Sequence, residues 1–242
     1  MAKLYEIDFA ALSGTEKSKF ILDLKKLAEE CFSAYPFEAT INAQLLIFTR
    51  YWNSYRLMAP EIPTPKILDT IMEMLWDYQE GTIEPSEFMQ FADCLDAVVI
   101  EIATGDTEKL DKDEAYYDFK ARYFWNWAEG ESCYDCFLID VSYLFQEISE
   151  HIIDWNGVQE IVDCDIADLK IPFLEEMDEA LDCTANVLEE WFQEVYDTPR
   201  FCEVISFMQK DIQTAMTGKP MAELRKQYQN EYLFSPEDCA KI

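Results

Sequence analysis

Residues Phe173 to Asp197 read FLEEMDEALDCTANVLEEWFQEVYD, and the periodicity of this stretch indicates the fold class more clearly than any other part of the chain. Its apolar residues and one threonine recur in alternating steps of three and four, which places their side chains on one stripe of an α-helix. The stripe consists of Leu174, Met177, Leu181, Thr184, Leu188, Trp191 and Val195. An amphipathic helix buries such a stripe against a core, so we expect a long helix after Pro172.

A second stripe of the same kind lies in residues 132–155. It consists of Phe137, Val141, Leu144, Ile148, Ile152 and Trp155. Helices joined by short connections tend to pack as antiparallel neighbours. The two stripes therefore favour a fold built from packed helices.

Glycines and prolines divide the rest of the chain into segments that also have helical period. Pro85 and Pro199 stand at first-turn positions, where proline is favoured. The predicted helices span residues 15–34, 37–58, 66–79, 86–104, 107–128, 132–155, 158–170, 173–197, 200–217 and 220–232. We expect an all-α fold of about ten helices in an irregular globular bundle, with stacked antiparallel helix pairs as the alternative. It should form a single domain over residues 1–242, or two intimate halves with a hinge near 104–114.

The composition is that of a folded but strongly acidic protein. Half of the 242 residues are hydrophobic, and the formal net charge is −30. Nucleic acid and anionic membranes should be repelled, whereas a basic protein should be attracted. The alternative is that the acidity serves only solubility or tolerance of high salt. The sequence has no apparent signal peptide or membrane span, so we expect a cytoplasmic protein with its eight cysteines reduced.

The negative charge is concentrated in one part of the chain. The 77 residues between Arg122 and Arg200 contain twenty acidic residues and one basic residue, Lys170. Like-charge pairs such as Glu175 and Glu179, spaced i and i+4, cost an isolated helix about 0.2–0.5 kcal/mol each. Two interpretations remain open: an ordinary solvated face, or a surface that meets lysine and arginine side chains of a partner.

Three motifs suggest chemistry but lack the residues to complete it. Cys133 and Cys136 form a C-x-x-C pair, yet no second close pair accompanies it, and His151 is the only histidine. Glu147 and Asp154 flank His151 without a nucleophile pattern. Residues 80–88 resemble the second half of an EF-hand calcium loop, but tryptophan and tyrosine occupy its first ligand positions. We expect no metal, no cofactor and no catalytic residue.

One pattern keeps an enzymatic alternative open. Glu175-Glu176-x-x-Glu179 followed by Glu194-x-x-Asp197 is similar to the carboxylate pattern of magnesium-dependent all-α nucleoside triphosphate pyrophosphohydrolases. In that family the carboxylates come from two antiparallel helices, which requires a chain break between the two halves of the pattern. Residues 173–197 read as one uninterrupted helix, which speaks against this function.

As a whole, the chain resembles the acidic all-α immunity proteins of bacterial polymorphic and contact-dependent toxin systems. The resemblance lies in acidity, helical periodicity and reduced cysteines, and it implies a non-enzymatic inhibitor that binds a basic toxin domain such as a nuclease. The alternative binding function is nucleic-acid mimicry against DNA-binding proteins. The sequence leaves the oligomeric state open. The expected partner-binding residues are Asp135, Asp140, Glu147, Glu150, Asp154, Asp163, Asp165, Asp168, Glu175, Glu179, Asp182 and Glu189.

Overall fold

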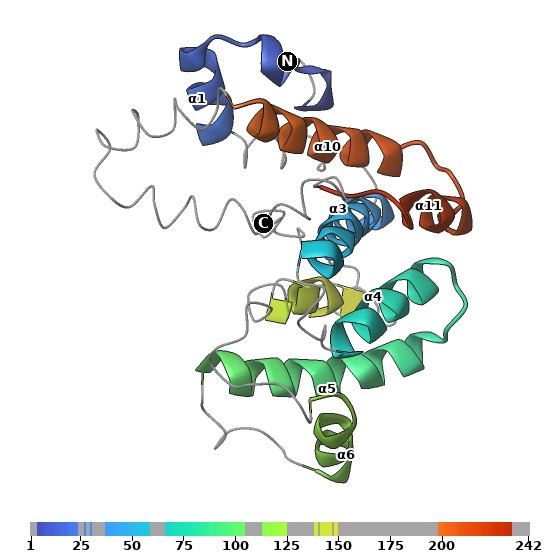
Figure 1. The fold of residues 1–242 in the computed structure, drawn as a ribbon. Coiled ribbons are helices and arrows are strands. Elements are labelled where there is room, and N and C mark those ends of the chain that lie inside the picture. Colours follow the sequence, from blue (N-terminus) through green and yellow to red (C-terminus); the bar gives the residue numbers. More distant parts are fainter. Residues whose placement is uncertain are drawn as a thin grey trace. The chain divides into compact units, whose positions relative to one another are not determined.

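The fold is all-α, as the helical periodicity predicted. A computed structural model describes residues 4–23, 27, 30, 37–58, 66–104, 113–124, 138–139, 141–146, 148–149 and 198–233. Two short 3₁₀ helices, η1 (Leu4–Glu6) and η2 (Phe9–Ala11), begin the described part of the chain. The α-helices labelled in Figure 1 are α1 (Gly14–Leu22), α3 (Phe37–Met58), α4 (Lys66–Gln79), α5 (Pro85–Thr104), α6 (Glu114–Tyr123), α10 (Pro199–Ala215) and α11 (Met221–Tyr228). The described residues include no strand, and none of their helices is long and apolar enough to span a membrane.

Several helix boundaries follow the sequence signals closely. Helices α3 and α4 have the predicted bounds, and α5 begins at Pro85. Helix α10 begins at Pro199, where the Thr198 hydroxyl accepts a hydrogen bond from the Phe201 N–H at 3.2 Å. Proline at the first helical position and threonine as the N-cap both satisfy the needs of a helix start.

Other predicted helices are described only in part. Val141, Leu144 and Ile148 of the predicted second stripe lie in helical segments and are buried. The predicted helices 158–170 and 173–197 lie outside the described residues, as does 105–112 of the predicted hinge.

The chain divides into two compact units. Unit 1 comprises residues 1–47 and 164–219, and unit 2 comprises 48–163 and 220–242. In unit 1, the Phe9 ring lies 5.1 Å from the Phe20 ring and 5.6 Å from the Phe201 ring, measured between centroids. The Gln209 side-chain amide donates hydrogen bonds to the carbonyls of Leu4 and Ile7, at 2.7 and 2.8 Å. This glutamine therefore fixes the N-terminal turns to α10.

Unit 2 has its core between α4, α5 and the segment around Phe145. Helix α4 buries one stripe of apolar side chains, formed by Ile67, Leu68, Ile71, Met72, Leu75 and Trp76. On α5, Phe88 is fully buried and stacks on Phe145, with ring centroids 4.7 Å apart and planes 3° from parallel. The indole N–H groups of buried Trp52 and Trp76 donate to Asp69 and Thr49, so neither tryptophan buries an unpaired donor.

Polar side chains of α3 hold the segment that follows α11. The Arg50 side chain is 1% exposed; its Nη1 donates to the Glu231 carboxylate at 2.8 Å and to the Tyr232 carbonyl at 3.1 Å. Asn53 Nδ2 donates to the carbonyls of Tyr228 and Glu231. The predicted continuation of this helix to residue 232 is therefore wrong: α11 ends at Tyr228, where α3 side chains take up the backbone carbonyls.

The turn between α4 and α5 depends on a glycine. Gly81 has φ of +69°, a left-handed conformation that glycine adopts without strain. The Gly81 N–H donates to the Tyr78 carbonyl and the Thr82 N–H to the Asp77 carbonyl, both at 2.9 Å. This pair of hydrogen bonds is the Schellman motif, which ends α4 and turns the chain into α5.

Replacing Arg50 with methionine should lower the free energy of unfolding by about 2 kcal/mol, because hydrogen bonds to charged groups contribute about 1.5–3 kcal/mol. Arg56 is the matched control: its side chain is 54% exposed, and its Nε lies 3.8 Å from an Asp69 oxygen. Arg56→Met should change the free energy by less than about 0.5 kcal/mol. Urea denaturation measures both, and equal losses would contradict the structural role of Arg50.

Replacing Gly81 with alanine should lower the free energy of unfolding by about 1 kcal/mol, since a Cβ atom disfavours the left-handed conformation. No heavy atom lies within 4 Å of the added Cβ, so the loss of stability comes from the backbone conformation alone and not from a steric clash. Gly14→Ala is the control, because its Cβ also meets open space and its φ is not left-handed. Thermal denaturation that shows the same midpoint for both variants would contradict the assignment.

Candidate protein-binding surface

The predicted partner-binding residues all lie outside the described residues, so their assignment stays a prediction. These residues are Asp135, Asp140, Glu147, Glu150, Asp154, Asp163, Asp165, Asp168, Glu175, Glu179, Asp182 and Glu189. Cys133, Cys136 and His151 also lie outside. The described residues provide other acidic side chains, whose surroundings distinguish structural carboxylates from exposed ones.

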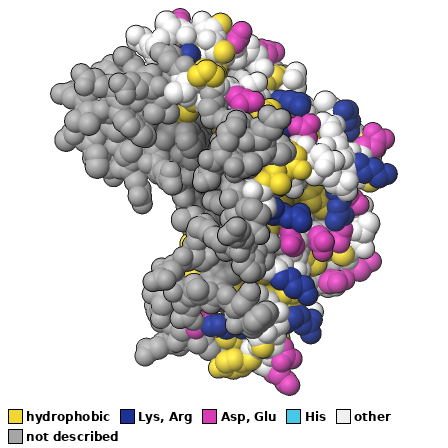
Figure 2. Space-filling view, viewed as in Figure 1, with side chains coloured by type: hydrophobic (Ala, Val, Ile, Leu, Met, Phe, Trp, Pro, Cys, Tyr) yellow, Lys and Arg dark blue, Asp and Glu magenta, His cyan; other side chains and the backbone are white. Residues whose placement is uncertain are grey.

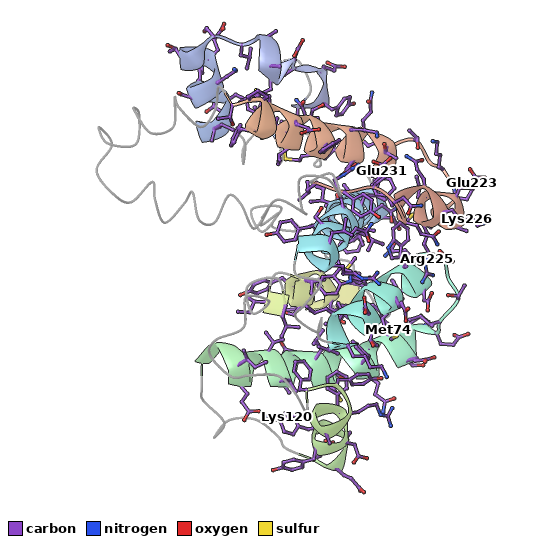
Figure 3. All side chains as sticks on the ribbon, in the orientation of Figure 1. Met74, Lys120, Glu223, Arg225, Lys226 and Glu231 are labelled. Atoms are coloured by element: carbon purple, nitrogen blue, oxygen red, sulfur yellow. The ribbon has the colours of Figure 1, made fainter. Side chains whose placement is uncertain are left out.

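Helices α4 and α5 with their turn carry nine acidic residues and one basic residue over residues 66–104. Two of the acids are neutralised by α11. Arg225 Nη1 lies 2.6 Å from Asp77 Oδ1 and 3.4 Å from Glu80 Oε1. Figure 3 shows Arg225 between α11 and α4. These two carboxylates stabilise the packing of α11 on α4 and are not free for a partner.

Two further acids also have structural roles. Asp69 Oδ1 accepts the Trp52 indole hydrogen bond at 3.0 Å. Glu101 Oε2 lies 2.7 Å from the ammonium of Lys120 and also accepts a hydrogen bond from the Tyr116 hydroxyl. Lys120, labelled in Figure 3, thus joins α6 to α5. An acid-rich sequence alone does not separate such carboxylates from those that face a partner.

The remaining five acids of this region are exposed and take part in no ion pair with a described residue. They are Glu73, Glu84, Glu87, Asp93 and Asp96. Partial burial, with the nearby charge of Asp93, raises the pKa of the Asp96 carboxyl. Burial raises the pKa of the neighbouring Cys94 thiol, and the charges of Asp113 and Asp93 add to this effect. Cys94 is therefore a protonated free thiol at neutral pH and a weak nucleophile.

Helix α6 combines exposed acids with an exposed aromatic ring. Its buried residues Tyr116 and Phe119 face α5, and Phe119 meets Phe91 edge to face at 5.1 Å. Tyr117, in contrast, is 57% exposed, the largest exposed fraction among the described large hydrophobic side chains. Glu114 and Asp118 are exposed beside it. Figure 2 shows hydrophobic and acidic side chains next to one another at the bottom of the view, where α6 lies.

Helical spacing in the sequence indicates that Tyr117 is exposed, and counting charges makes no use of that spacing. Tyr116, Phe119 and Tyr123 are spaced i, i+3 and i+7 and form one stripe, whereas Tyr117 is rotated off that stripe by one helical step. Further along the chain, Phe124 is buried, whereas Tyr143 is 39% exposed.

A search for metal sites among the described histidine, cysteine, aspartate and glutamate side chains finds no cluster of three or more. No protein-family model matches the chain, and no curated protein or solved structure matches it significantly. The function is therefore inferred from the charge distribution of the sequence and from the side chains of the described residues.

Replacing Asp96 with asparagine should raise the free energy of unfolding at pH 7 by about 0.2–0.5 kcal/mol, the usual cost of a like-charge pair at this helical spacing. The folded state holds the Asp96 proton more tightly than the unfolded state, so its ionisation lowers stability as pH rises through the folded pKa. The gain should shrink below about pH 3, under the usual aspartate pKa of about 3.9, where the Asp96 carboxyl is largely protonated in both the folded and the unfolded state. Urea midpoints at the two pH values measure this, and an equal gain at both would contradict it.

Proposed function

We propose that this protein is a stoichiometric inhibitor of a basic protein, of the kind that neutralises a toxin domain such as a nuclease. The observation that supports this function is the concentration of twenty acidic residues against one basic residue between Arg122 and Arg200. A surface with such an excess of one charge attracts a basic partner from a distance and repels nucleic acid. The proposed contact surface comprises the twelve acidic residues predicted from the sequence.

The described helices support the proposal in a second way. Bases neutralise the acids that hold unit 2 together, while the acids exposed on α5 and α6 have no ion-pair partner among the described residues. A chain that needed acidity only for its own fold would not need these additional carboxylates. Unpaired surface acids are instead suited to pair with lysine and arginine side chains of a partner.

Inhibition follows from what such basic side chains do in a nuclease. Lysine and arginine hold the phosphates of its substrate. Carboxylates that pair with those side chains occupy the same positions and block the substrate path. No catalytic group of the inhibitor is needed, and the complex should weaken as salt rises.

The test is a pull-down from the source cell's lysate at low salt, with a separate wash at about 0.5 M salt to disrupt exposed ion pairs. The native protein should retain one basic partner in a 1:1 complex and inhibit its activity. Reversing Glu175, Glu179, Asp182 and Glu189 to lysine should weaken binding by at least about tenfold. Reversing Glu6, Glu73, Glu84 and Glu203, which are exposed acids outside the segment 123–199, is the matched control and should retain the partner.

Three results would redirect the assignment. A partner retained equally by both variants would contradict the proposed surface. Absence of any basic partner, together with pyrophosphate release from nucleotides in the presence of magnesium, would replace inhibition with hydrolysis. Competition with DNA for several unrelated DNA-binding proteins would replace a single cognate partner with nucleic-acid mimicry.

A further inference from the structure

One face of α6 is exposed. Glu114, Tyr117, Asp118 and Ala121 follow the spacing i, i+3, i+4 and i+7, so their side chains share one side of the helix. All four are exposed, whereas Tyr116 and Phe119 on the other side are buried. We call these four residues the α6 outer face.

The Tyr117 ring packs against a residue that is itself fixed to α5. It lies 5.3 Å from the Tyr116 ring in an edge-to-face arrangement, and the Tyr116 hydroxyl is held by Glu101. Lys120 pairs with the same carboxylate at 2.7 Å, and Phe119 packs on Phe91. These contacts fix α6 on α5, so a partner that binds Tyr117 need not order the helix itself.

Two acidic side chains flank this ring on the α6 outer face. Glu114 and Asp118 make no ion pair with a described residue. Of the two bases on this helix, Lys120 pairs with Glu101, and Arg122 lies over the Tyr123 ring, 5.9 Å from its centroid. The α6 outer face therefore presents an aromatic ring between two carboxylates that form no ion pair within the described part of the chain.

We propose that the α6 outer face is a docking surface for an arginine-bearing segment of a protein partner. A guanidinium can lie over the Tyr117 ring while its N–H groups donate to the Glu114 or Asp118 carboxylates. Tyrosine is enriched among the residues that dominate binding energy at protein interfaces. The same charges disfavour a nucleic acid or an anionic lipid surface.

This surface lies outside the acidic segment 123–199 and depends on the proposed function only in that the partner is basic. It would give the inhibitor a second contact area. The α6 outer face and the acidic segment 123–199 share no residue, so variants can test each one separately.

The test uses the full-length ¹⁵N-labelled protein and a defined probe, an acetylated hexa-arginine amide, titrated at low ionic strength. The amide resonances of residues 113–122 should shift saturably. Tyr117→Ala should weaken this response about two- to fivefold, the range of an exposed cation–π contact. Tyr117→Phe, which keeps the ring and loses only the hydroxyl, should retain the native affinity. The double variant Glu114→Gln/Asp118→Asn should bind more weakly and with less salt dependence.

The same peptide with citrulline in place of arginine is the uncharged control. Equal shifts with citrulline, unshifted α6 amides, or an unchanged affinity in Tyr117→Ala would each overturn this docking surface. None of these outcomes concerns the acidic segment 123–199, whose amides are followed in the same spectra. The proposed inhibitor function is contradicted by a different result, namely that the native protein retains no basic protein in the pull-down.

Discussion

The buried guanidinium of Arg50 is the interaction on which unit 2 most depends. A charged group in the interior must find partners, and this one finds the Glu231 carboxylate and the Tyr232 carbonyl. Asn53, one turn further along α3, takes the carbonyls of Tyr228 and Glu231, where α11 ends. Arg50 and Asn53 together hold the segment after α11 on α3, and Arg225 separately joins α11 to the carboxylates of α4.

Local signals predicted much of the fold because they act within a few residues. The glycines and prolines between segments sufficed for the bounds of α3 and α4, and they placed α5 to within one residue at its start. The end of α11 was not predictable in this way, because the side chains that terminate it come from α3, about 175 positions earlier in the chain. Such tertiary contacts override the local preference of residues 229–232 for a helix.

The sequence predicted the kind of candidate site, an acidic protein-binding surface, but not which carboxylates are available for a partner. Charge counting locates an acidic segment and predicts a basic partner, but it does not distinguish Asp77 from Asp93. The structure separates them, since Asp77 pairs with Arg225 and Asp93 is exposed without an ion pair among the described residues. The exposure of Tyr117 could be predicted only from helical periodicity, because composition does not distinguish it from its neighbour Tyr116, which is buried against α5.

The hydrogen bonds that close each unit also set the order in which the chain can fold during synthesis. Gln209 binds the Leu4 carbonyl across 205 positions, and Arg50 binds Glu231 across 181. The ribosome delivers the N-terminal residues first, and contacts of such long sequence separation form slowly. Helix α5 contacts both α4 and α6, so these three helices can pack as they are made, whereas the contacts of α3 with the segment after α11, and of the N-terminal turns with α10, must wait for the last part of the chain.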